Sequence, residues 1–176
     1  MGSDPLGSDP IKNIGFVLQF SSMNKVIHMG TDHAGFELKE TIKQFLTTQN
    51  YTVIDHGATQ IEPSDDYPDF IIPAVGAAIQ NNERALVFGG SGLGEAIAAN
   101  KVKGARAVVI YDEFTAIKSR EHNDSNVLCL GERTATSDFE LAKKLVQLWL
   151  DTPFSDDPRH LRRLQKISAY ENSSRN

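Results

Sequence analysis

One glycine-rich segment carries the strongest chemical signal in the sequence. It reads Gly89-Gly90-Ser91-Gly92-Leu93-Gly94 and lies between an apolar run and a helical pattern. Glycines let backbone N–H groups converge on a bound group at the positive end of a helix dipole. The segment therefore predicts a site for a phosphate, a carboxylate or a developing oxyanion. It fits neither G-x-G-x-x-G nor a Walker A loop, and a tight turn that uses glycine only for packing is the alternative.

Glu95 falls in the first turn of the helix expected after this segment. A carboxylate there is favoured by the helix dipole and could be no more than a capping charge. Beside an oxyanion site it could also remove a proton from a carbon next to a carbonyl, while the backbone dipoles hold the enediolate. The spacing leaves capping and catalysis equally open. The dipole should lower the pKa of Glu95 and keep it ionised, while burial should raise this pKa.

Two further segments place histidines at the ends of expected elements. Asp32 follows the first apolar run as a natural helix N-cap, and His33 could hydrogen-bond an anionic or hydroxylated ligand. His122 and Asn123 end a later helical pattern. A histidine in that position is often only a dipole partner, although it could also transfer protons near neutral pH.

The densest basic cluster contains Arg159, His160, Arg162 and Arg163. Arg159 and Arg163 are four residues apart and share one helical face, which suits them to hold a phosphate with forked donors. Arg133, beyond the fifth apolar run, could join them. A solvated helix face or a weak nucleic-acid contact are the alternatives. The five histidines and one cysteine show no metal-ligand spacing, so no metal site is expected.

Apolar runs and helical patterns alternate along the chain and must position these residues. The runs cover 25–29, 51–55, 85–88, 106–111 and 126–130, and the helical patterns cover 34–49, 68–81, 92–103, 112–122, 138–150 and 158–172. This alternation predicts a single Rossmann-like α/β domain, with a five-stranded parallel sheet and helices on both faces. The default strand order is 2-1-3-4-5 or a close relative, with ligands bound beyond the carboxyl ends of the strands. Pro73 argues against an unbroken helix over 68–81.

Composition and charge narrow the classes of function. The 176 residues suit one domain that needs neither disulfides nor metal to fold. A net charge of -5 argues against a general nucleic-acid binder. Cys129 is the single cysteine, which favours a reducing cytoplasm, and we expect it to be a small buried hydrophobic residue. No apolar run approaches the roughly 18 residues of a membrane span.

The first 22 residues differ in character from the rest. Gly-Ser-Asp-Pro occurs at 2–5 and again at 7–10, ahead of a mildly apolar stretch. Such a repeat is typical of a tag or linker. Residues 1–22 are therefore expected to be a tag, a linker or a disordered N-terminus, with Met23 as a natural start and the folded domain over 23–176.

Five motifs in order resemble the B-type ribose-5-phosphate isomerases, the family that also holds allose-6-phosphate and galactose-6-phosphate isomerases. The motifs are Asp32-His33-Ala34-Gly35; Tyr67-Pro68-Asp69; Gly90-Ser91-Gly92-Leu93-Gly94 followed by Ile97-Ala98-Ala99-Asn100-Lys101; Arg120-Glu121-His122-Asn123; and Thr152-Pro153-Phe154 ahead of Arg159-His160. One branch of the family uses a cysteine just before the glycine loop, where this chain has Gly89. The other uses a glutamate directly after the loop, where this chain has Glu95. The resemblance therefore implies a glutamate-type enzyme.

The resemblance also implies a reaction and a set of roles. The expected reaction interconverts ribose 5-phosphate and ribulose 5-phosphate through an enediolate and needs no cofactor. The expected assembly is a homodimer or a dimer of dimers, with active sites shared between subunits. Glu95 would transfer the proton between carbons, and His122 would open the sugar ring. The loop 90–94 would hold the enediolate. Further substrate-binding residues would be Asp32, His33, Tyr67, Asn123, Arg133, Arg159 and Arg163.

Three alternatives stay open at this point. A six-carbon sugar phosphate such as allose 6-phosphate differs by one carbon, and the sequence does not reveal pocket depth. A non-catalytic sugar-phosphate binder would keep the phosphate site, but the presence of both Glu95 and His122 argues against it. A nucleic-acid role rests only on residues 159–166 and conflicts with the acidic balance.

Overall fold

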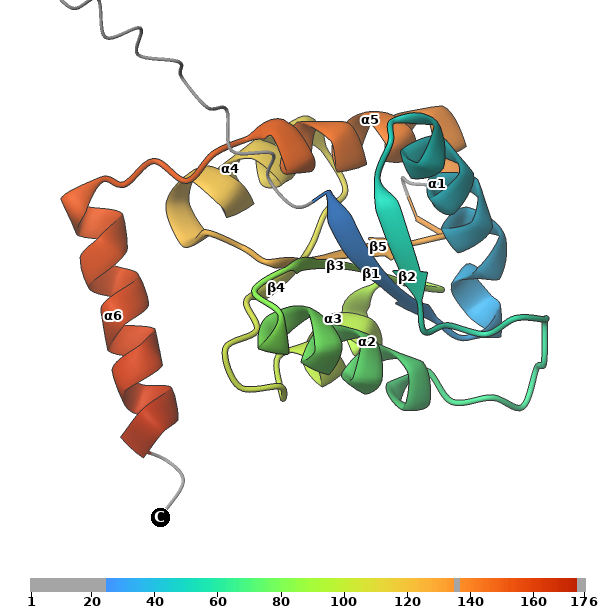
Figure 1. The fold of residues 1–176 in the computed structure, drawn as a ribbon, viewed down its shortest axis with the longest axis horizontal. Helices are drawn as coiled ribbons and strands as arrows, with labels where there is room; N and C mark the ends of the chain where they lie inside the picture. Colours follow the sequence, from blue (N-terminus) through green and yellow to red (C-terminus); the bar gives the residue numbers. More distant parts are fainter. Residues whose placement is uncertain (1–24, 135–136, 174–176) are drawn as a thin grey trace, which may run out of the picture.

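A parallel five-stranded sheet lies at the centre of the molecule (Figure 1). The computed structural model describes residues 25–134 and 137–173. The strands are β1 (Val26–Thr31), β2 (Thr52–Asp55), β3 (Arg84–Gly89), β4 (Ala107–Val109) and β5 (Val127–Gly131), and every neighbouring pair is parallel. The predicted five-stranded parallel sheet is confirmed. The tag or linker expected over 1–22 lies outside the described residues.

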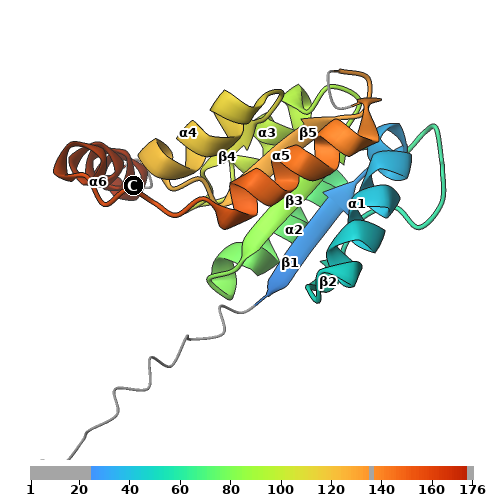
Figure 2. The same cartoon turned by 90° about the horizontal axis from the view of Figure 1, so that it is seen from above.

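Helices cover both faces of the sheet, as the alternation predicted. They are the 3-10 turn η1 (His33–Gly35), α1 (Phe36–Thr48), α2 (Pro68–Gln80), α3 (Leu93–Ala99), α4 (Glu113–Asn123), α5 (Phe139–Asp151) and α6 (Pro158–Ser173). The helices α1, α4 and α5 lie over one face, α2 and α3 lie over the other, and α6 projects from one side (Figures 1 and 2). Within the described ranges, none of the helices has the length and apolar character needed to cross a membrane.

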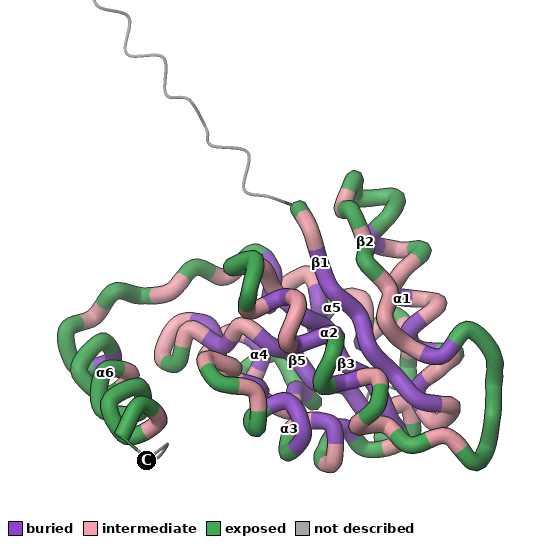
Figure 3. Tube along the Cα trace, turned by 60° about the horizontal axis from the view of Figure 1, so that its bottom comes forward, coloured by how far each residue is buried: buried purple, intermediate pink, exposed green. Residues whose placement is uncertain are grey.

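The central strands are apolar on both sides because each side has its own helical layer. In β5, Leu128 and Leu130 belong to the core cluster under α1 and α5, whereas Val127 and Cys129 belong to the cluster under α2 and α3. All five residues of β5 are buried, and Figure 3 shows the same continuous burial along β1 and β3. This double burial is the reason that these strands read as unbroken apolar runs.

The observed strand order is β2-β1-β3-β5-β4, a close relative of the default order in which the last two strands are exchanged. The burial pattern gives the physical reason. β4 has three residues, two of them only partly buried, whereas β5 is buried throughout. A short, half-covered strand suits the edge, and the fully apolar strand takes the place beside β3.

Of two expectations about the helices, the helix over 68–81 is confirmed, whereas the length of the next helix was wrong. α2 is continuous from Pro68 to Gln80 despite Pro73. Pro73 is exposed, and so is Asp69, whose carbonyl would otherwise receive the missing amide, so water can satisfy that carbonyl. α3 is shorter than predicted because the Asn100 side chain bonds the backbone of Ala107 in both directions, which turns the chain into β4.

Cys129 has no exposed surface, as expected, and burial raises the pKa of its thiol. We expect the native thiol to resist a disulfide-exchange reagent that labels it fully after unfolding. Cys129→Ala should lower the free energy of unfolding by about 1 kcal/mol, the typical effect of a core substitution, and leave turnover near that of the parent. Loss of turnover in a folded variant would instead indicate a thiol mechanism.

Candidate active site

A pocket of about 480 Å³ opens where the strands β1, β3 and β5 end. Eight of the predicted site residues line it: Asp32, His33, Tyr67, Gly90, Ser91, Gly94, Glu95 and Arg133. Ala34 and Thr134, which were not predicted, complete the wall. Gly92 and Leu93 belong to the same loop without lining the pocket. One wall thus combines segments that lie about a hundred residues apart along the chain.

Sheet register brings these segments together. Thr31 lies opposite Phe88, and Gly89 lies opposite Gly131, so three strands end at one level. The ladder continues past the sheet, because the N–H of Glu132 donates to the Gly89 carbonyl at 2.9 Å and that of Arg133 to the Gly90 carbonyl at 3.0 Å. These backbone bonds fix the position of the glycine loop before any side chain contributes.

The glycine loop needs glycine at two positions for different reasons. Gly92 begins α3 with φ +78°, a left-handed conformation that side chains disfavour. At Gly89 the requirement is space, because a Cβ atom there would lie 1.7 Å from Glu95 Oε1. The carboxyl group of Glu95 therefore occupies the volume that a side chain at position 89 would fill. A cysteine at 89 and a glutamate at 95 exclude one another in this backbone.

Glu95 is buried to 4% exposure, and its Oε2 has no hydrogen-bond partner among the described residues. Burial raises the pKa of this carboxyl, and the charge of Asp32 acts in the same direction. Backbone N–H groups of Gly92 and of Glu95 itself oppose the shift. The sequence predicted that the helix dipole would lower this pKa and that burial would raise it, and burial has the larger effect. A buried carboxyl with one unpaired oxygen, on a residue that lines a pocket, suits proton transfer better than helix capping.

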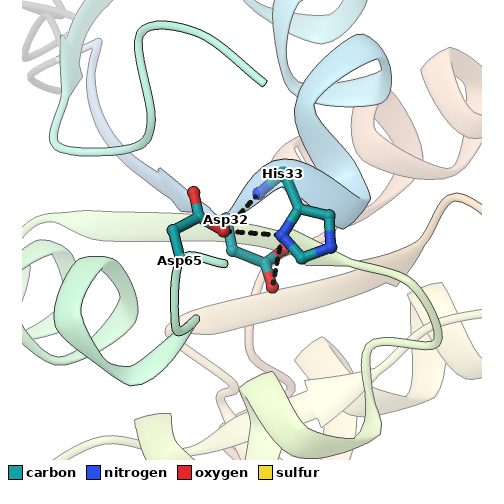
Figure 4. Close-up of side chains that lie close together, drawn as sticks. All are labelled: Asp32, His33 and Asp65. Atoms are coloured by element: carbon teal, nitrogen blue, oxygen red, sulfur yellow. Dashed lines mark hydrogen bonds and ion pairs between the residues drawn. The ribbon is translucent and has the colours of Figure 1, made fainter. Parts of the chain in front are cut away.

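Asp32 has the capping role that its position predicted, and it also lines the pocket. Its Oδ1 accepts the Ala34 N–H at 2.9 Å, at the start of η1. The neighbouring His33 has its Nδ1 2.6 Å from Asp65 Oδ1, and the backbone N–H of His33 donates to the same oxygen at 3.1 Å (Figure 4). The bond to Asp65 is the main cause that raises the pKa of His33.

Asp65 was not among the predicted site residues. It lies in the irregular segment between β2 and α2, beyond the carboxyl end of β2. Its place after a strand marks the segment as one that faces ligands, but no periodicity indicates which of its acidic residues contacts His33. The pairing is purely tertiary, across 32 positions of the chain.

A histidine with two carboxylates is also a donor set that a cation can use, and one donor atom each from Asp32, His33 and Asp65 lie within 4.8 Å of one another. The hydrogen bonds explain this spacing without an ion. A ring nitrogen 2.6 Å from a carboxylate oxygen carries the proton between them, and a protonated Nδ1 cannot bind a metal. The residues therefore form a hydrogen-bonded cluster.

The remaining predicted residues lie at the other end of the sheet. His122 and Asn123 are in the last turn of α4, and the His122 ring lies 4.3 Å from the ring of His160, centroid to centroid. Arg159 and Arg163 are exposed on α6. Figure 2 shows the end of α4 and α6 on one side of the molecule and the start of α1 on the opposite side.

This separation follows from the parallel topology. α4 leads directly into the amino end of β5, whereas the glycine loop packs against its carboxyl end. A strand rises about 3.3 Å per residue, so the five residues of β5 hold the two groups roughly 16 Å apart. Within one chain, His122 and Glu95 cannot act on one small ligand.

Comparison with known proteins agrees with this arrangement of motifs. The family model described as Ribose/Galactose Isomerase matches residues 27–167. The chain belongs to this family. Ribose-5-phosphate isomerase B of Mycolicibacterium paratuberculosis is 41% identical over 146 residues, which cover 82% of this chain and 91% of that protein.

Solved structures of the isomerase family share the fold. Ribose-5-phosphate isomerase B from Clostridium thermocellum has a TM-score of 0.78 and 42% identity, covering 84% of this chain and 97% of the other. The Mycoplasma genitalium enzyme, solved with bound ribulose-5-phosphate, has a TM-score of 0.80 and 36% identity, covering 85% and 97%. The fold and family expected from the motifs are thus confirmed.

The contact between Gly89 and Glu95 yields a direct test. Gly89→Ala should displace the Glu95 carboxyl and lower isomerase kcat by on the order of 10² or more, comparable to loss of a general base. Gly76→Ala is the matched control, because a Cβ there meets nothing within 4 Å. It should keep full activity and gain roughly 0.5–1 kcal/mol in stability, as alanine replaces a helical glycine. Normal turnover by a folded Gly89→Ala variant would show that the carboxyl does not need this space.

Proposed function

We propose that this chain is an aldose–ketose isomerase that interconverts ribose 5-phosphate and ribulose 5-phosphate. The observation that carries the proposal is the buried, half-unpaired Glu95 carboxyl beside the glycine loop, in a pocket whose other wall holds His33 and Arg133. The names of the relatives support the five-carbon substrate over allose 6-phosphate, since several are ribose-5-phosphate isomerases B and one was solved with ribulose-5-phosphate.

Groups of both charges line the pocket, and their different burial suggests how the substrate lies. Asp32 and Glu95 are buried carboxyl groups, whereas Arg133 is exposed. We place the phosphate group toward His33 and Arg133, and the carbons C1 and C2 toward Glu95. Arginine donors bind the phosphate equally in substrate and product, so they position the sugar and do not select the transition state.

Glu95 is assigned as the base in this proposal. Its carboxylate takes the proton from C2 of the open-chain aldose, and the electron pair of the broken C–H bond forms the 1,2-enediolate. The N–H groups of the 90–94 loop stabilise the negative oxygen. The carboxyl then returns the proton to C1, while the hydroxyl proton moves from O2 to O1. A raised pKa suits this cycle, because the group must both accept and return a proton.

A second copy of the chain completes the site in this account. His122, proposed to open the sugar ring, lies at the amino end of the sheet with Asn123, Arg159 and Arg163. If two copies pack with the amino end of one against the carboxyl end of the other, these residues face the glycine loop of the partner. Twofold symmetry then gives two equivalent sites.

The exposure of α6 supports such a dimer. Of its sixteen residues, His160 alone is buried, although the helix is amphipathic and carries Leu161 and Ile167 on its surface. A helix that buries so little gains its stability from packing against another surface. We assign that surface to a second copy, which would also bring Arg159 and Arg163 to the partner's pocket.

Glu95→Gln tests the proposal, because it keeps the shape of the side chain but cannot accept a proton. In a coupled assay with ribose 5-phosphate, kcat should fall by on the order of 10² to 10⁴, the usual contribution of a general base. In D₂O the parent should wash deuterium into the transferred position, and the variant should do so far more slowly. Glu140→Gln on the exposed surface of α5 is the control and should act like the parent.

Two outcomes would contradict the proposal. Normal turnover by Glu95→Gln would leave Glu95 as a helix-capping charge. A preference of the parent for allose 6-phosphate over ribose 5-phosphate would move the substrate assignment to the six-carbon class. The direction of the pKa shift adds a further expectation: activity should fall as the pH drops through a value above the usual range of a glutamate.

A further inference from the structure

The segment between β2 and α2 brings one largely buried acidic group to His33, which lines the pocket. Residues 59–64 of this segment are exposed, but the Asp65 side chain keeps only 12% of its surface accessible. Desolvating a carboxylate costs free energy unless hydrogen bonds replace the lost water. Asp65 Oδ1 accepts two such bonds, from the backbone N–H and from the ring Nδ1 of His33, while its buried Oδ2 has no partner among the described residues. The segment is thus tied to the pocket through His33.

The bonds from His33 to Asp65 settle which ring nitrogen faces a ligand. Nδ1 is held by Asp65, and the second carboxylate, that of Asp32, lies 3.9 Å from the same nitrogen. Figure 4 shows the other ring nitrogen pointing away from both carboxylates. Since His33 lines the pocket, Nε2 is the atom available to a ligand. It can donate to an oxyanion only if the ring is doubly protonated, because Nδ1 already carries one proton.

We propose that Asp65 is a positioning residue, which holds His33 with Nε2–H directed at the phosphate of the sugar substrate. The proposal rests on the proposed function, which supplies the phosphate. Asp65 contacts no substrate atom in this account. It fixes the ring orientation and compensates the positive charge that His33 must carry to bind an anion.

The charges around His33 determine how phosphate binding by this histidine depends on pH. Asp65 and Asp32 favour the protonated ring, whereas Arg133, from the segment after β5, disfavours it. Glu95 and Tyr67 line the same pocket. Because the pKa of His33 is raised, the ring stays protonated further toward neutral pH than a free histidine. Phosphate binding should weaken as the pH rises through that pKa, and removal of the Asp65 charge should move the weakening to lower pH.

Asp65→Asn tests the proposal against Asp66→Asn, which neutralises the adjacent exposed residue of the same segment. We expect Asp65→Asn to raise KM for ribose 5-phosphate at neutral pH by about tenfold, as for loss of a charged hydrogen bond, with kcat changed much less. The rise of KM with pH should begin at lower pH than in the parent. Asp66→Asn should follow the parent in both respects.

Proton and nitrogen NMR of the His33 ring gives a readout that does not depend on catalysis. The ring should titrate at lower pH in Asp65→Asn than in the parent, and Asp65→Glu, which keeps the charge, should restore part of the shift. Unchanged titration of His33 in Asp65→Asn, or superimposable KM profiles, would overturn the proposal. If the parent fails to isomerise ribose 5-phosphate, the proposed function falls, whereas the NMR titration still decides whether Asp65 controls His33.

Discussion

The parallel pairing of β1, β3 and β5 is the constraint on which the rest of the structure depends. Because of this pairing, the three strands end at the same level of the sheet. Backbone hydrogen bonds beyond Gly89 and Gly131 continue the pairing into the loops. The position of the glycine loop follows from this register through backbone hydrogen bonds alone. The same parallel direction sends the end of α4 to the opposite edge. The parallel topology therefore forms the pocket and, within one chain, keeps His122 away from Glu95.

The local chemistry of the pocket depends on a buried carboxyl group that lacks part of its hydrogen bonds. The carboxyl group of Glu95 fits because position 89 has no side chain. One oxygen of this carboxyl is buried without a hydrogen-bond partner among the described residues. Such a group lowers stability, which the two apolar clusters on either side of the sheet offset. His33 is the converse case, since its charge is favoured by Asp65 and Asp32. Burial thus suits Glu95 to exchange a proton, whereas the hydrogen bond to Asp65 favours the protonated form of His33.

Much of the fold could be predicted from the sequence, and eight of the residues predicted for the site line one pocket. Apolar runs bounded by turn residues locate the strands, because both faces of the sheet are buried. The glycine segment, Asp32 and Glu95 are evident because each has a local role at a strand end that its residue type reveals. The exchange of the last two strands was not predicted, because the default ignores the contrast between the partly buried β4 and the fully buried β5. Asp65 was missed because its bond to His33 depends on the path of an irregular segment.

Mixed dimers test the central claim, which is that one site combines Glu95 of one copy with His122 of the other. Glu95→Gln and His122→Gln chains with different affinity tags would be co-expressed, and the heterodimer isolated by both tags. If the sites are shared, one site of the heterodimer carries both substitutions and the other carries neither. The account predicts about half the activity of the parent dimer, far above either variant alone, because twofold symmetry gives two equivalent sites. A heterodimer no more active than the single variants would contradict it.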